Sequence, residues 1–259
     1  MQIWQAIVLG AVQGFTEFLP VSSSGHLILL SRWLGVKQYS LFFGVMLHLG
    51  TLVPVGIVFF NQIKSLFKKP FNKLWLLVLA TIPAGVVGLL IKKIIDLDQV
   101  FTEHLWLLGV AFVFTAIELL ITQRLSTKAL NNQPLGVKSS LTMGIGQALA
   151  VFPGLSRSGT TIFFGQMAGL NRENTANFTF LMSIPIILSA VLLEGAECVS
   201  VGGVGDGVIV ATLFGVLTSA VTGYIAVKAM LKVIKNANYK WFSLYLIILG
   251  ALTIIGGAW

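Results

Sequence analysis

The stretch QGFTEFLPVSSSGH, residues 13 to 26, places a carboxylate, three serines and a histidine inside an otherwise apolar chain. Apolar residues on both sides predict helix, but Leu19-Pro20 favours the end of one half-helix and the serines favour the start of another. Irregular backbone is tolerated at membrane depth only where protein buries it or where it lines a cavity. Residues 1 to 30 are therefore predicted to form a re-entrant helical hairpin.

The composition of the whole chain is that of an integral membrane protein. Of its 259 residues, 56% are hydrophobic and 10% are charged, and the mean hydropathy is +0.91. Crossing a hydrocarbon core takes about 20 apolar helical residues. Six stretches meet this length and are predicted to span the bilayer: about 39 to 60, 74 to 92, 105 to 123, 174 to 194, 207 to 231 and 241 to 258.

The basic residues of the loops predict the orientation of these spans. The net charge of +8 comes largely from lysines in short loops, so we interpret it as a topology signal and as contacts to anionic lipid, not as a nucleic-acid site. The basic loops near residues 64 to 73, 124 to 138 and 228 to 240 are predicted to be cytoplasmic. Arg32 and Lys37, on the predicted outer side, are a mild contradiction.

A second broken segment, residues 141 to 168, contains VFPGLSRSGTTIFFG. Three predicted spans follow each broken segment, so the two segments must enter from opposite faces. A shift of 134 positions aligns Gln13 with Gln147 and Ser22 with Ser156, although chance matching among glycine- and serine-rich stretches is an alternative. Inverted repeats place their sites near the membrane midplane.

These observations predict one all-α, polytopic membrane domain over residues 1 to 259. It consists of six transmembrane helices plus two re-entrant helical hairpins, in inverted repeats of about 1 to 123 and about 135 to 259. The two hairpin tips are expected to meet. On the charge count, their site should open to the outer face of the membrane.

The two tips together carry the chemistry of an oxyanion site. Glu17 and Arg157 each cost at least about 2.5 kcal/mol in a membrane segment, so both are functional candidates, although they could simply neutralise one another. Arginine's planar fork suits phosphate oxygens, and backbone N–H groups at helix starts bind anions without adding charge. Further candidates for binding an anion are Ser22, Ser24, Ser156, Ser158, Thr161 and Gly154.

The first tip could also supply an activated nucleophile. Ser22 or Ser23 would share a helix face with His26, and a hydroxyl beside an imidazole is such an arrangement. The structural alternative is a pair of N-capping serines with a hydrogen-bonded histidine. Glu17 could bind a divalent cation or orient His26, and Gln13, one turn earlier, would offer a neutral oxygen ligand.

The first stretch and PGLSRSGTT, residues 153 to 161, resemble the two motifs of the undecaprenyl-diphosphate phosphatase family, the bacitracin-resistance type of membrane phosphatase. The resemblance covers essentially the whole chain. It implies hydrolysis of a C55 isoprenyl diphosphate to the monophosphate, which carries cell-wall precursors, at the bacterial cytoplasmic membrane and with Mg²⁺ or Ca²⁺. Bacitracin tolerance is a further implication.

With this resemblance, Ser23 is assigned as nucleophile, His26 as its base and Arg157 as the clamp on the diphosphate. Glu17 would bind the metal or orient His26. Attack by Ser22, by His26 or by water remains an alternative. Gln13 occupies a motif position where the family has glutamate or glutamine, so we expect the metal to be held by one carboxylate and by the diphosphate itself.

Other functions and residues stay open from the sequence. The architecture also suits a secondary transporter or a flippase of a phosphorylated lipid or anion. Small residues every four positions, Gly215, Ser219 and Gly223, indicate a helix-packing face or a homodimer face. His48 is expected to bond a neighbouring helix or to line the site. Glu118 is expected to reach the membrane interface, to pair with Arg124 or to relay protons.

Overall fold

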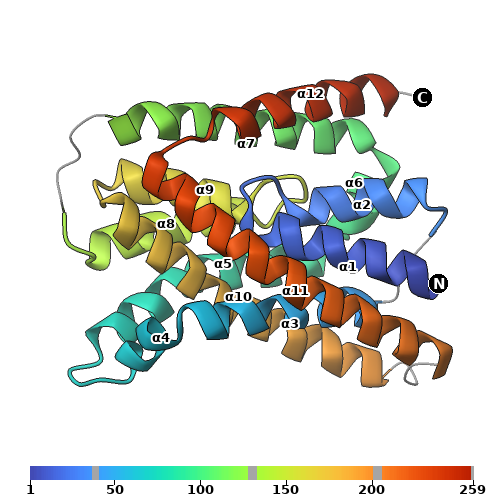
Figure 1. Ribbon diagram of the computed structural model, residues 1–259, viewed down its shortest axis with the longest axis horizontal. Coiled ribbons are helices and arrows are strands. Elements are labelled where there is room, and N and C mark those ends of the chain that lie inside the picture. The colour runs from blue at the N-terminus through green and yellow to red at the C-terminus, as the bar shows by residue number, and fades with distance from the viewer. Residues whose placement is uncertain (37–40, 128–132, 201–205, 258–259) are drawn as a thin grey trace.

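The computed structural model describes residues 1–36, 41–127, 133–200 and 206–257, and these residues fold into twelve helices (Figure 1). Between them the described chain forms loops and one isolated bridge, Gln133 to Leu170. Lys37 and Lys128, two of the loop charges considered above, lie outside the described residues. The helices are α1 (Ile3–Phe18), α2 (Ser23–Trp33), α3 (Leu41–Val58), α4 (Phe60–Leu66), α5 (Asn72–Ile94), α6 (Leu97–Glu103), α7 (Leu105–Thr127), α8 (Val137–Leu149), α9 (Arg157–Met167), α10 (Arg172–Ser200), α11 (Asp206–Asn236) and α12 (Lys240–Gly256).

Both broken segments are confirmed as two half-helices separated by a loop. In each, the second half-helix begins with a serine N-cap: Ser22 Oγ accepts from Gly25 N at 3.4 Å, and Ser156 Oγ accepts from Gly159 N at 3.2 Å. These serines satisfy N–H groups that the helix itself leaves unpaired. The capping residues are those that the shift of 134 positions aligns.

The long apolar helices agree with a multi-pass membrane protein. Within the described residues α5, α7, α10 and α11 are long and apolar enough to cross a bilayer, and α3 with α4 forms a fifth, broken candidate that bends by 87°. The helix α12 is apolar but has 17 residues. The count of six full spans therefore stays a prediction. The short helices α4 and α6 were not predicted.

The two halves of the chain are interlocked. Helix α1 packs along α11, whereas α8 packs along α5, and α7 pairs with α12. The small residues of α11 serve this packing: a Cβ on Gly14 of α1 would lie 2.7 Å from Gly223 N and closer still to Ser219 O. The small-residue face is thus used inside the chain, which removes the observation that suggested a homodimer.

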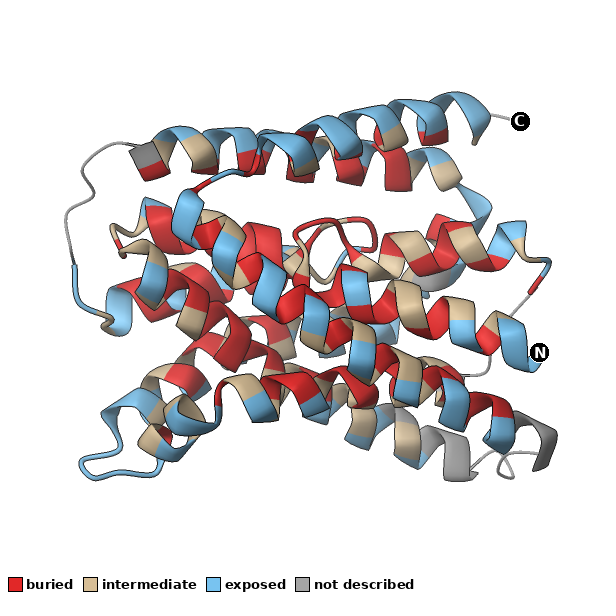
Figure 2. Cartoon of the chain, in the orientation of Figure 1, coloured by how far each residue is buried: buried red, intermediate tan, exposed pale blue. Residues whose placement is uncertain are grey.

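The loops of the two hairpins meet at the centre of the molecule, where Figure 2 shows them largely buried. Ser158 Oγ donates to Leu19 O at 3.1 Å. A Cβ on Gly25 would lie 3.1 Å from Gly154 Cα and 2.7 Å from the Phe112 ring, so this approach requires a glycine at position 25. Gly154 also has a φ of +89°, which favours glycine. The predicted meeting of the two tips is therefore confirmed.

Candidate active site

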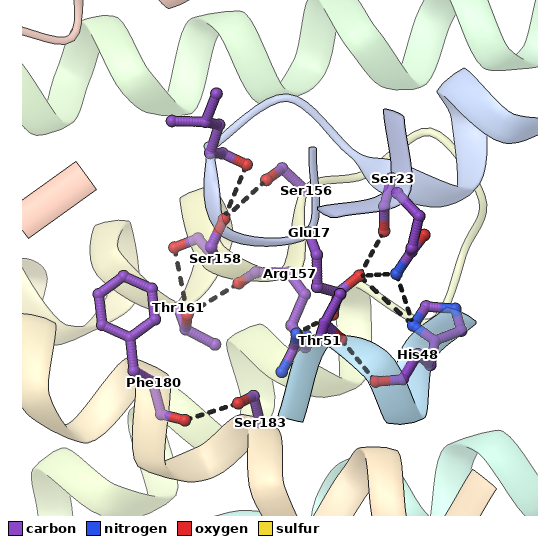
Figure 3. A network of polar contacts seen from close by, with 12 residues as sticks. Glu17, Ser23, His48, Thr51, Ser156, Arg157, Ser158, Thr161, Phe180 and Ser183 are labelled. Carbon is purple, nitrogen blue, oxygen red and sulfur yellow. Dashed lines mark hydrogen bonds and ion pairs between the residues drawn. The ribbon is translucent and has the colours of Figure 1, made fainter. Parts of the chain in front are cut away.

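Glu17 is the centre of a polar network that joins both tips (Figure 3). Its side chain is 4% exposed, and Oε1 is paired with Arg157 Nη2. Oε2 accepts from Ser23 Oγ at 2.7 Å and from Gln13 Nε2 at 3.0 Å. The carboxylate is thus neutralised by arginine and oriented by two further donors, which is how a buried charge is tolerated.

The serine hydroxyl faces a carboxylate and not an imidazole. Ser23 opens α2, one residue after the N-cap, and the break at Leu19–Ser22 turns α2 back so that this serine faces α1. A hydroxyl that donates to a carboxylate has a proton acceptor in hydrogen-bond reach. The structure therefore brings Ser23 and Glu17 together in the geometry of a nucleophile and its base.

His26 does not bond a serine hydroxyl, contrary to the expectation from its spacing. Its Nδ1 lies 2.7 Å from the backbone oxygen of Ser22, and its Nε2 lies 2.7 Å from Tyr245 Oη. Both ring nitrogens are therefore engaged away from Ser23 and from Glu17. The helical spacing was right, but the imidazole turns toward α12, where it forms a hydrogen bond with the Tyr245 hydroxyl.

The second tip contributes fewer side chains to the site than the sequence suggested. The Thr161 hydroxyl bonds the carbonyl oxygen of Arg157 at 2.7 Å within its own helix, and Ser158 bonds the first tip. Gly154 packs against Ala111 and Leu108 of α7. These three residues shape the tips and do not line the cavity described below.

A cavity of about 210 Å³ opens beside this network. Its polar part is lined by predicted site residues: Glu17, Ser22, Ser23, Ser24, Ser156 and Arg157. An apolar wall faces them, with Val45 from α3 and Ile186, Ile187, Ala190 and Val191 from α10. A cavity with convergent polar groups on one side and an apolar wall on the other suits an amphipathic ligand with an anionic head.

The donor set fits a divalent cation held mainly by its ligand. Gln13 Oε1 is buried and has no hydrogen-bond partner among the described residues, and it belongs to the side chain that contacts Glu17. No cluster of three or more histidine, cysteine, aspartate or glutamate side chains occurs in the described part of the chain. Mg²⁺ is commonly bound by one or two carboxylates together with substrate phosphates. Glu17 is compatible with that mode, and Gln13 would join it once its amide rotates, because its Nε2 is the atom that faces Glu17 in this structure.

The comparison with known proteins identifies the family of the chain. The family of the bacitracin resistance protein BacA matches residues 6–252. The chain belongs to the BacA family. Similar relatives are the undecaprenyl-diphosphatases of Carboxydothermus hydrogenoformans, 39% identical over 98% of this chain and 97% of the relative, and of Methanobrevibacter smithii, 37% identical over 99% and 98%. The undecaprenyl-diphosphatase of Rubrobacter xylanophilus is 38% identical over 97% of each chain.

Within this BacA-family chain, the structure adds His48 to the site. His48 of α3 lines the cavity, its Nδ1 lies 2.9 Å from Gln13 Nε2, and it lies 3.5 Å from Glu17 Oε2. Both alternatives for His48 therefore hold, since it bonds a neighbouring helix and lines the site. An ionisable residue inside a predicted span is a functional candidate by default, so the sequence already contained a signal for placing His48 in the site.

Glu118 of α7 is buried against the half-helix α9. It is 3% exposed, so it does not reach the membrane interface. Its Oε2 accepts from Thr160 Oγ1 of α9 at 2.7 Å. On the same face of α7, Thr115 Oγ1 accepts from the backbone N–H of Ser156 at 3.1 Å. This face of α7 therefore fixes the half-helix that carries Arg157.

Proposed function

We propose that this protein hydrolyses undecaprenyl diphosphate to undecaprenyl phosphate and inorganic phosphate. The observation that carries the proposal is that Ser23 and Arg157 contact opposite oxygens of one buried carboxylate, Glu17, at the edge of a cavity. A hydroxyl with an acceptor for its proton and a guanidinium are the two groups that phosphoryl transfer to a protein nucleophile requires. The relatives named undecaprenyl-diphosphatase support this substrate.

The substrate is placed by the two walls of the cavity. The diphosphate lies on the polar side, where Arg157 clamps its oxygens and Ser22, Ser24 and Ser156 donate hydrogen bonds. The first isoprene units lie on the apolar wall from α3 and α10, and the rest of the tail stays in lipid. Transfer of each buried CH₂ group from water would be worth about 0.8 kcal/mol, but a tail that is already in lipid gains little, so the headgroup contacts determine orientation.

The chemical step transfers a phosphoryl group to Ser23. Ser23 Oγ attacks the terminal phosphorus, its proton passes to Glu17, and the bond from phosphorus to the bridging oxygen breaks, so that undecaprenyl phosphate leaves. Glu17 gives that proton to the departing undecaprenyl phosphate and is again a carboxylate. It then takes a proton from a water molecule that attacks the phosphoserine, and it returns this proton to Ser23 Oγ as inorganic phosphate is released. When the diphosphate takes over Arg157, Oε1 of Glu17 is released for other partners, and Oε2 keeps its contact with the Ser23 hydroxyl.

A divalent cation is part of the proposal. Glu17 and Gln13 Oε1 would hold Mg²⁺ or Ca²⁺ together with the diphosphate, and the cation would neutralise charge on the phosphate oxygens. The orphaned amide oxygen of Gln13 supports this assignment. Removing divalent cations with a chelator is expected to abolish phosphate release, and adding Mg²⁺ or Ca²⁺ is expected to restore it.

We further propose that the site opens to the outer face of the cytoplasmic membrane, where it recycles the carrier lipid of cell-wall synthesis and so supports bacitracin tolerance. The basic loops between the spans support this orientation. A cysteine introduced at Ser24, which lines the cavity, should react with a membrane-impermeant thiol reagent added to intact cells. Labelling only from the cytoplasmic side would reverse the orientation.

The test of the activity is phosphate release from a long-chain isoprenyl diphosphate by the purified protein in detergent. Ser23→Ala and Arg157→Ala should both abolish release while the protein still folds. Ser65→Ala is the matched control, because that hydroxyl bonds its own helix at Gln62 O, away from the site. A phosphorylated Ser23 trapped by rapid acid quench would identify the nucleophile.

The alternative of a transporter or flippase makes a different prediction in the same experiment. A folded wild-type protein that binds the lipid but releases no phosphate would support transport and overturn the phosphatase. The hydrogen bond from Ser23 to Glu17 favours the phosphatase, since binding and moving an anion requires no activated hydroxyl.

A further inference from the structure

His26 is held between two helices that do not belong to its own hairpin. Its ring lies 5.7 Å from that of Tyr245 on α12, nearly parallel to it at 18°, and 5.4 Å from that of Phe112 on α7. Its nitrogens bond the Ser22 carbonyl and the Tyr245 hydroxyl, each at 2.7 Å. The imidazole is thus fixed by ring packing on two sides and by a hydrogen bond at each nitrogen.

These hydrogen bonds determine the tautomer of His26. A carbonyl oxygen only accepts, so Nδ1 must carry the proton and donate to Ser22 O. Nε2 of the neutral ring is then an acceptor, and the Tyr245 hydroxyl donates to it. The order of donation runs from Tyr245 through His26 to the backbone of Ser22.

Ser22 is a strained residue that needs such support. Its φ of 69° lies in the left-handed region, which costs a residue other than glycine about 1–3 kcal/mol and persists where surrounding contacts fix it. The next residue is Ser23, whose hydroxyl contacts Glu17. Any rotation of the Ser22 peptide therefore moves the nucleophile relative to its base.

Tyr245 acts on this turn from outside the cavity. Its side chain is 45% exposed on α12, and it is not among the residues that line the cavity. It can therefore affect the reaction only through His26. Helix α12 packs against α7, which gives this hydroxyl a fixed position relative to the hairpin.

We propose that Tyr245 is a positioning residue for the hydrolysis. Its hydroxyl holds the His26 ring in the orientation in which Nδ1 donates to the Ser22 carbonyl, and the anchored turn aims Ser23 at Glu17. The inference rests on the proposed function, because it concerns the geometry of the same nucleophile.

The second hairpin has a matching contact. The shift of 134 positions pairs His26 with Thr160, and Thr160 bonds Glu118 of α7 as His26 bonds Tyr245 of α12. Both half-helices that begin at a tip are therefore fastened to the α7–α12 pair. Because a side-chain hydrogen bond to this helix pair occurs at matching positions in both halves, we interpret it as a contact that positions the tips.

The test is Tyr245→Phe, which removes one hydroxyl and keeps the ring. We expect kcat for phosphate release to fall by about tenfold or more with KM unchanged, because small displacements of a nucleophile cost up to about 100-fold while the substrate contacts are intact. Tyr224→Phe on α11 is the matched control and should keep wild-type kcat. Melting temperatures of all three proteins are measured in the same detergent.

A second readout does not depend on catalysis. In protein labelled with ¹⁵N at its histidines, the chemical shifts of His26 should show Nδ1 protonated, and Tyr245→Phe should change the shift of Nε2 and leave Nδ1 protonated. Unchanged kcat in Tyr245→Phe, or a fall in kcat that follows only a loss of melting temperature, would overturn the proposal. If the wild type released no phosphate, the proposed function would fail, while the ¹⁵N measurement would still test the hydrogen bond.

Discussion

The ion pair between Glu17 and Arg157 can be removed by replacing either residue, and the two replacements are expected to differ in their cost to stability. Glu17 has a side chain 4% exposed, whereas that of Arg157 is 18% exposed and borders the cavity. Replacing Arg157 with Met leaves a buried carboxylate without its cation. Replacing Glu17 with Gln leaves a guanidinium that can turn into the cavity and keep part of its hydration.

The magnitudes follow from these environments. Removing one partner of a buried ion pair costs about 3–5 kcal/mol when the remaining charge is uncompensated. For Arg157→Met we expect about 3 kcal/mol, the lower end, because Ser23 and Gln13 still donate to the carboxylate. For Glu17→Gln we expect about 1–2 kcal/mol, since the Arg157 side chain, which borders the cavity, keeps part of its hydration. The double variant should cost less than Arg157→Met alone, because no charge is then stranded.

The assay is a double-mutant cycle on the free energy of unfolding in mixed detergent micelles, run beside phosphate release. The pairwise term should be about 1–3 kcal/mol, as found for residues in direct contact. All three variants should release no phosphate although their stabilities differ, so the loss of activity does not follow the loss of stability. Two single costs that simply add in the double variant would show that the ion pair does not form, and the role given to Arg157 would have to be revised.

Three further predictions concern packing, the metal and the second tip. Gly14→Ala forces a Cβ against α11 and should lower the free energy of unfolding by about 1–3 kcal/mol through overpacking, whereas Gly56→Ala has open space around it and should cost less than about 0.5 kcal/mol. Equal costs for the two variants would contradict the close approach of α1 and α11. Gln13→Glu adds a negative charge to the proposed metal ligands and should lower the Mg²⁺ concentration for half-maximal phosphate release by about tenfold, equivalent to about 1.4 kcal/mol. An unchanged Mg²⁺ titration would show that residue 13 is not a metal ligand. Thr160→Val leaves the Glu118 carboxylate without its hydrogen-bond donor and should lower the free energy of unfolding by about 1–3 kcal/mol, while the stability of Thr160→Ser should remain close to that of the wild type. A Thr160→Val protein as stable as the wild type would show that this hydrogen bond does not contribute to stability.

The breaks in the two hairpins were predictable because their causes are local. Proline at position 20 and glycines and serines near each tip act on their own backbone, so a short window of sequence contains the information. The proximity of Glu17 and Arg157 was predictable for a different reason. Each charge buried in an apolar segment costs free energy, and pairing the two charges across the hairpins lowers that cost.

The contacts of the imidazoles were not predictable in the same way. His48 is 35 residues from Gln13, and His26 is 219 residues from Tyr245, so both contacts depend on how distant helices pack. Helical spacing placed Ser23 and His26 on neighbouring turns, which is right, but spacing does not state which way a ring turns. That direction is decided by the strongest partner within reach, and for His26 the partner lies on the last helix of the chain.

The predicted duplication is consistent with a single site. At a shift of 134 positions, Glu17 corresponds to Val151 and Ser23 corresponds to Arg157, so the two tips carry complementary groups. Two identical tips would bring two carboxylates or two guanidinium groups together, and like charges in such a setting disfavour one another. The tips contact each other and form one composite site, in which one half supplies Ser23 and Glu17, the proposed nucleophile and base, and the other supplies the guanidinium of Arg157. The apolar Val151 at the edge of that cavity is then the residue that keeps a second carboxylate out of it.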